Sequence, residues 1–114
     1  MIFKAMQDLV NTLRAGGVRA ALDRRDLNPP GVLVMPPTVE YQVDPTWAEA
    51  EWTLLCAVPD SGTGTAAQSL SDLVEQVREA LGWTAVSGRA AQVTTTDGPP
   101  SPAYALTFTT QIGD

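Results

Sequence analysis

Two Pro-Pro pairs frame a short apolar segment and constrain the fold more than any other feature of the chain. The stretch "DLNPPGVLVMPPTVEY" spans residues 26–41, and "GVLVM" stands between the pairs. Proline lacks a backbone N–H and holds the residue before it in extended geometry, so it is excluded from the middle of a sheet. Five non-polar residues between such barriers predict a short strand with both faces buried. The second pair then marks where a new strand begins.

The segments after this frame alternate between apolar and polar residues, as half-buried strands do. Residues 38–43 place Val39, Tyr41 and Val43 on one side. Residues 47–58 form the longest predicted strand, although the Ala-Glu repeat in its first half also favours a helix. One side of this strand is predicted to carry Trp52, Leu54, Cys56 and Val58.

Three further strands are expected. Residues 18–23 predict a short one. Residues 89–96 and 103–112 predict an antiparallel hairpin, because the Gly-Pro-Pro-rich stretch 97–102 between them is expected to be a wide irregular loop. The inward side of the last strand is predicted to carry Tyr104, Leu106, Phe108 and Ile112.

Two amphipathic helices complete the pattern. Residues 2–15 have apolar side chains at helical spacing, and the Gly16-Gly17 pair that follows is a typical helix end. A membrane-surface helix is the alternative interpretation of this segment, but its polar side has few cations. Thr65 and Gln68 match a capping box that opens a second helix, which ends near Gly82.

The order of these elements predicts an α/β (α+β) fold in a single domain over residues 1–114. We expect a two-layer sandwich in which two amphipathic helices cover one face of a mostly antiparallel mixed sheet. A chain of 114 residues is long enough to bury a core without disulfide or metal staples.

Charge and composition exclude several function classes. The formal net charge is −6 and no basic run occurs, so we do not expect tight nucleic-acid binding, although DNA could slide past such a surface. Cys56 is the single cysteine, which rules out an internal disulfide. No apolar run approaches the roughly 20 residues of a membrane helix and no signal peptide is evident, so we expect synthesis and folding in a cytoplasm.

The residue chemistry indicates a non-catalytic protein without cofactor or metal. The chain contains no histidine, the commonest general base and metal ligand. Cys56 lies on the apolar side of its predicted strand and is interpreted as a structural thiol. The segment "SGTGT" lacks the remaining residues of a phosphate loop, and nearby Asp60 is interpreted as a turn or cap residue. An enzyme is therefore the least favoured class, since no convergent polar set is evident.

The candidate interface residues are Trp47, Glu49, Glu51, Asp60 and Trp83. Glu49 and Glu51 share one side of a strand, where a solvated or interface role is favoured over acid–base catalysis. Trp47 and Trp83 stand beside loops and either cap the core or enter a subunit contact. A small open sheet also has two edges that can recruit other chains, and a closed ring is one way to use them.

The chain resembles the tail terminator (minor tail) proteins of long-tailed actinobacterial phages, similar to the lambda-type terminator. The resemblance runs from the opening helix through "LRAGGVRAALDRRDLNPPGVLVMPPTVEY", "WTLLCAVPDSG" and a helix ending "ALG" to "PAYALTFTTQI". Its strongest part is residues 13–41. These motifs are structural, and the resemblance supplies no catalytic residue.

The resemblance implies a structural virion protein of the tail and neck, assembled in the bacterial host cytoplasm. Such proteins form a hexameric ring on the last ring of the major tail tube protein, stop its polymerisation and meet the head-completion or connector proteins. DNA passes through the lumen without specific binding, and no membrane is involved. The alternatives are a head–tail connector or stopper of the neck and, in another class, a small dimeric regulatory or ligand-binding α/β domain.

Overall fold

The fold is an α+β sandwich, as the sequence predicts. The computed structural model describes residues 2–41, 43, 46–59, 62–82, 86–93 and 100–113. In chain order the elements are α1 (Ile2–Ala15), β1 (Ala20–Ala21), the 3₁₀ helix η1 (Arg24–Asp26), β2 (Gly31–Val34), β3 (Thr38–Tyr41), β4 (Trp47–Ala57), α2 (Thr63–Ala80), β5 (Ser87–Val93) and β6 (Ser101–Gly113).

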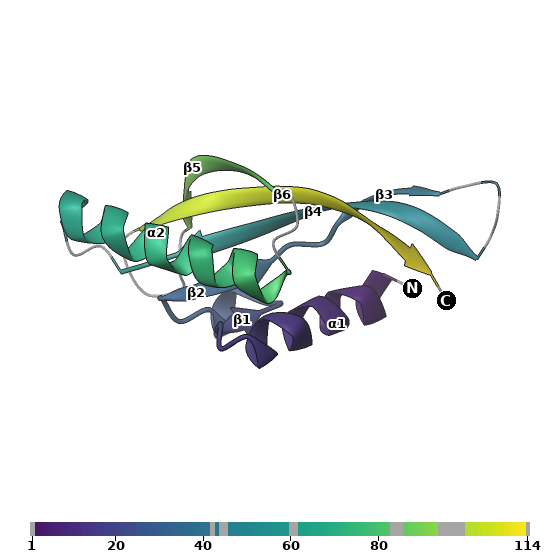
Figure 1. Cartoon of the computed structure of the whole chain (residues 1–114), viewed down its shortest axis with the longest axis horizontal. Coiled ribbons are helices and arrows are strands. Elements are labelled where there is room, and N and C mark those ends of the chain that lie inside the picture. Colours follow the sequence, from purple (N-terminus) through teal and green to yellow (C-terminus); the bar gives the residue numbers. More distant parts are fainter. Residues whose placement is uncertain are drawn as a thin grey trace.

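The strands form one mixed sheet, and both helices lie against the same face of it (Figure 1). The strand order is β1-β2-β4-β6-β5, and β3 pairs with β4 outside this path. Only the β1–β2 pair is parallel. The molecule measures 49 × 28 × 24 Å, and β3, the start of β4 and the end of β6 form its narrow end away from α2 (Figure 1).

The second Pro-Pro pair separates two strands that follow the same edge of β4. β2 pairs with Leu54–Ala57, and β3 pairs with Ala48–Glu51. Between them the backbone N–H of Met35 donates to the carbonyl of Thr53, and Pro36-Pro37 follows. Because proline offers no donor, ladder pairing stops there and resumes at Thr38. The prolines therefore delimit the strands, as the sequence predicts.

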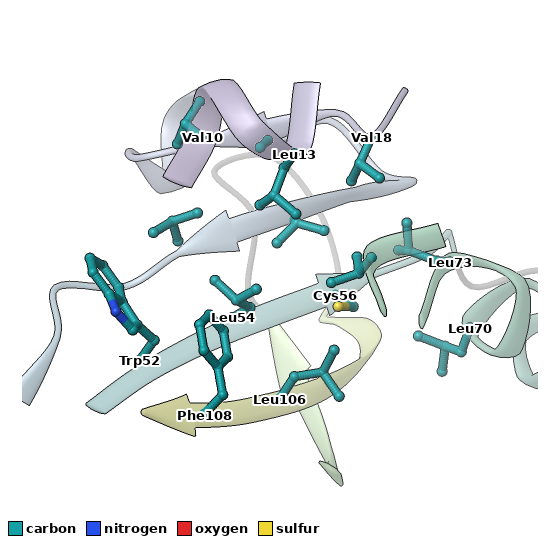
Figure 2. Close-up of a cluster of buried hydrophobic side chains, with 14 of the residues drawn as sticks. Val10, Leu13, Val18, Trp52, Leu54, Cys56, Leu70, Leu73, Leu106 and Phe108 are labelled. Carbon is teal, nitrogen blue, oxygen red and sulfur yellow. The ribbon is translucent and has the colours of Figure 1, made fainter. Parts of the chain in front are cut away.

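The main core lies between the helices and the sheet (Figure 2). The predicted apolar side of β4, from Trp52 to Val58, is buried there. Leu13 of α1 and Val77 of α2 are fully buried against it. At the end of α1 the N–H of Val18 donates to the carbonyl of Leu13 at 3.0 Å, and Gly17 has a φ of 84°. This Schellman arrangement confirms the predicted glycine stop.

A smaller apolar cluster lies on the opposite face, which neither α1 nor α2 covers and which we call the helix-free face (Figure 1). Leu27, just after η1, covers this cluster, which also contains Leu33, Ala57, Val93 and Ala103. The carboxylate of Asp23 caps η1 by accepting the N–H of Arg25 at 2.9 Å, and the hydrogen bonds from Arg25 lower the pKa of Asp23. The segment predicted as loop after residue 23 thus contains a capped turn that lies against the sheet.

Several local expectations need correction. α2 begins at Thr63, so Thr65 lies inside the helix and the capping box is absent; Gln68 donates to Asp72 instead, at 3.0 Å. Ser101 and Pro102, expected in the loop, already belong to β6. A Ser-Pro start is tolerated because proline fits the first residues of a strand.

Tyr104, predicted to point inward, is exposed, and so is Tyr41 on the apolar side of β3. Tyr104 shares a side with buried Leu106 yet is 39% exposed, and Tyr41 is 67% exposed beside partly buried Val39. Alternation along a strand fixes the face but not how closely the helical layer covers it. Tyr104, for example, lines a groove of about 480 Å³ opposite Leu70 and Val74 of α2. The predicted strand 38–43 is described as β3 only to Tyr41.

Candidate functional site

The helix-free face of the sheet carries a group of three carboxylates at its narrow end. Glu40 of β3 is the direct cross-strand neighbour of Glu49, and Glu51 lies two residues further along β4. All three side chains are exposed. Strands β3, β4 and β6 contain no Lys or Arg, so no cation of these strands neutralises the group. We call Glu40, Glu49 and Glu51 the carboxylate strip.

Polar uncharged residues surround this strip. Glu49 lies opposite Gln111 of β6, and Glu51 lies between Thr38 and Thr109. Sequence reasoning placed Glu49 and Glu51 on one exposed side, which the structure confirms, but it missed Glu40. The sequence does contain a signal for Glu40, because it lies between Val39 and Tyr41 in an alternating strand and must face away from them. The result is an acidic and polar surface.

The other candidate interface residues are less informative. Trp47 is half-buried at the start of β4, on the same face as Glu49, and its cross-strand neighbour is Gly113. The structure therefore brings Trp47, Glu49 and Glu51 together. Asp60 and Trp83 lie outside the described residues.

A groove of about 300 Å³ runs between α1 and the last part of β6. Leu9 and Thr12 of α1 form one wall, and Phe108 and Ile112 of β6 form the other. Trp52 and Thr110 also line it, and the indole Nε1 of Trp52 donates to the Thr110 hydroxyl at 2.8 Å. The groove therefore combines apolar side chains with this hydrogen bond and with Lys4 and Asp8, which also line it and form an exposed ion pair of 2.9 Å.

Cys56 lies on the helix-covered face of β4 and is inaccessible to solvent. Burial raises the pKa of its thiol from 9.0 to about 12, because the thiolate loses its hydration in the core. Cys56 thus behaves as the structural thiol that the sequence predicts. Among the described residues, no three His, Cys, Asp or Glu side chains are placed to hold a metal ion.

Exposed apolar side chains at the narrow end are the feature that sequence reasoning missed. Tyr41 and Val43 follow along β3 and just beyond it, and Phe3 of α1 is 59% exposed. Tyr41 lies on the helix-covered face of the sheet, because its cross-strand neighbour Ala48 is in the core. Within the described residues, no helix has the length and apolar character needed to cross a membrane.

Comparison with protein-family models, with curated proteins and with solved structures finds no match to this chain.

Proposed function

We propose that this chain is a structural tail terminator, a ring-forming protein that caps a phage tail tube and lets DNA pass through its lumen. The observation that carries the proposal is the carboxylate strip, three exposed glutamates on the sheet face that α1 and α2 leave uncovered. A surface of this kind suits the wall of a DNA channel, because carboxylates repel phosphates and prevent sticking. In the ring, the helix-free face of each copy lines the lumen and the helices lie outside.

The carboxylate strip lowers the stability of the sheet, and this supports a functional role. Glu40 and Glu49 are directly opposite each other, and like charges in such a pair destabilise a sheet. Folding alone would be served equally well by a neutral or oppositely charged residue at either position. A repulsive pair on strands that carry no Lys or Arg fits a surface whose negative potential has a function.

The experiment that tests the proposal mixes the purified protein with tail tubes and images them by negative staining. Six-fold rings at the tube ends, with tube growth stopped, are expected. A stable dimer that ignores the tubes would overturn the proposal. Rings found only at the portal end of DNA-filled heads would instead identify a connector of the neck.

The role of the strip is tested separately in assembled particles. Glu40→Gln, Glu49→Gln and Glu51→Gln together should leave ring assembly intact and slow DNA release. The matched control is Asp72→Asn, Glu75→Gln and Glu79→Gln on α2, which removes the same number of charges from the helical layer. Equal DNA release from the two triple variants would show that the strip does not face DNA.

A further inference from the structure

The last part of β6 has an open edge. β5 pairs with Ser101–Thr107 only, so Phe108–Gly113 has β4 on one side and no strand on the other in the described part of the chain. β3 pairs only with β4 and is open on its outer side within the same part. We call these the open edge of β6 and the open edge of β3.

The two open edges lie at the same level on opposite sides of a three-strand section. Thr38 and Thr109 are both cross-strand neighbours of Glu51. Tyr41 and Ile112 are likewise both neighbours of Ala48. The two open edges are therefore at the same height along the strand direction, with β4 between them. Copies arranged around one rotation axis could therefore join β3 to β6 without any shift along that axis.

The open edge of β6 also lacks the protection that other edges of this sheet have. The segment "TFTTQI", residues 107–112, is rich in β-branched and aromatic residues and has no charge, proline or glycine. In contrast, β5 carries Arg89 and Gly88, and β1 has only two residues. Soluble proteins guard long edges against pairing with other chains, so an unguarded edge indicates one that is occupied.

The surfaces beside the two edges match in character. Tyr41 extends from the helix-covered side of β3 and is 67% exposed. The groove beside the open edge of β6 lies on the same side of the sheet; Leu9, Phe108 and Ile112 give it apolar surface, and the Lys4–Asp8 ion pair also lines it. A second copy's β3 placed against β6 would put the partner's Tyr41 on the groove side.

We propose that β3 of one copy pairs with Phe108–Gly113 of β6 in a second copy, so that the sheets join into a closed ring. β3 and β6 are both antiparallel to β4 and thus run in the same direction. A head-to-tail ring therefore makes this junction parallel, whereas a two-fold dimer would pair β6 antiparallel with its own copy. This interface adds detail to the proposed function. The pairing of β3 with β6 is argued from the two edges, and only the closure of the ring rests on the proposed function.

Paired cysteines test the junction in the full chain, with the buried Cys56 left in place. Thr38→Cys combined with Thr109→Cys puts one exposed thiol on each edge, on the same face of the sheet. Within one copy β4 separates these positions by roughly 10 Å, which is too far for a disulfide. Glu40→Cys with Gln111→Cys is the second pair, offset by two residues.

Oxidation of each double variant, alone and with tail tubes, should give a ladder of covalent multimers for at least one pair. The single variants should give none. A dimer from Thr109→Cys alone would indicate two-fold pairing of β6 and overturn the proposal. Six-fold rings without any covalent ladder would overturn this interface while leaving the terminator function in place. If neither rings nor ladders form with tubes, both proposals fail.

Tyr41→Ala tests the side-chain contact. We expect an unchanged melting curve for the monomer, because Tyr41 is largely exposed, and ring assembly weakened about tenfold or more, as for a buried interface tyrosine. Tyr104→Ala is the matched control, since Tyr104 is partly exposed on β6 beside β5, outside the open edge. Unimpaired assembly of Tyr41→Ala would contradict the proposed packing.

Discussion

The indole nitrogen of Trp52 on β4 donates a hydrogen bond of 2.8 Å to the hydroxyl of Thr110 on β6. The two residues are diagonal neighbours, because Trp52 lies directly opposite Phe108. Trp52 is 2% exposed, so its N–H depends on this hydroxyl. The bond fixes the tryptophan ring between α1 and the sheet at the point where the narrow end begins.

Thr110→Val should therefore lower the free energy of unfolding by about 1–3 kcal/mol, because a buried donor loses its acceptor while the shape of the side chain is kept. Thr109→Val is the matched control. Thr109 is on the same strand but exposed on the other face, and its replacement should change stability by less than about 0.5 kcal/mol. Urea denaturation of both variants measures the difference. Equal effects would mean that the bond contributes nothing beyond strand propensity.

Gly16, directly after α1, lies close to Ala80 at the end of α2. A Cβ built on Gly16 would lie 2.6 Å from the Cβ of Ala80 and 3.2 Å from its Cα. Gly16→Ala should destabilise the fold by about 1–3 kcal/mol, because α1 and α2 must move apart. Gly64→Ala in α2 meets nothing within 4 Å and should instead stabilise it by about 0.4–1 kcal/mol. Thermal unfolding should show opposite signs for the two variants, and a stabilising Gly16→Ala would contradict the close packing.

The sequence predicts the layers of this fold because burial on a sheet with one covered face follows a period of two. The apolar side of β4 and the glycine stops of both helices are confirmed for that reason. The predicted capping box at Thr65 is wrong, because α2 begins two residues earlier, at Thr63. Its N-cap is Gly62, which has no side chain to cap the helix.

The candidate site is predicted only in part. Glu49 and Glu51 are identified from alternation along β4, whereas the addition of Glu40 depends on the β3–β4 register. The open edge of β6 also depends on register, because β5 begins at Ser87, opposite Thr107, and does not reach Phe108–Gly113. Alternation within one segment carries no information about how far its neighbour extends, so neither feature follows from the pattern.

Cys56 makes stability depend on alkaline pH. Its thiol titrates at 9.0 when exposed and at about 12 in the core, so the unfolded chain releases the proton first. The protonated thiol therefore makes its full contribution to the free energy of unfolding below pH 9. As pH rises from 9 towards 12, this contribution is lost by about 1.4 kcal/mol per pH unit. Cys56→Ala should lower stability at pH 7 but flatten this slope. Denaturation between pH 8 and 11 measures both slopes, and identical slopes would show that another group is responsible.

The Pro36-Pro37 pair should stabilise the fold through the unfolded chain. Both prolines lie between β2 and β3, where the chain changes from one part of the β4 edge to the next. Replacing both with alanine should lower the free energy of unfolding by about 1–2 kcal/mol, since each proline restricts the unfolded ensemble. The same variant should also assemble into rings more weakly, because β3, which forms the proposed interface, is less restricted without the prolines before it. An unchanged melting temperature would mean that the pair ends the strand without stiffening it.

Glu40→Lys should separate stability from function. The substitution turns the like-charge pair with Glu49 into an opposite-charge pair, which should stabilise the monomer by about 0.2–1 kcal/mol. The same change places a cation on the surface proposed to face DNA, so DNA should be retained in assembled particles and its release should slow. Chemical denaturation measures the first effect and DNA release from particles measures the second. The control is Gln76→Lys on the exposed side of α2, which adds a cation away from the sheet and should leave DNA release unchanged. A Glu40→Lys protein that is more stable and releases DNA normally would remove the reason for keeping two glutamates opposite each other, and with it the argument for a DNA-facing strip.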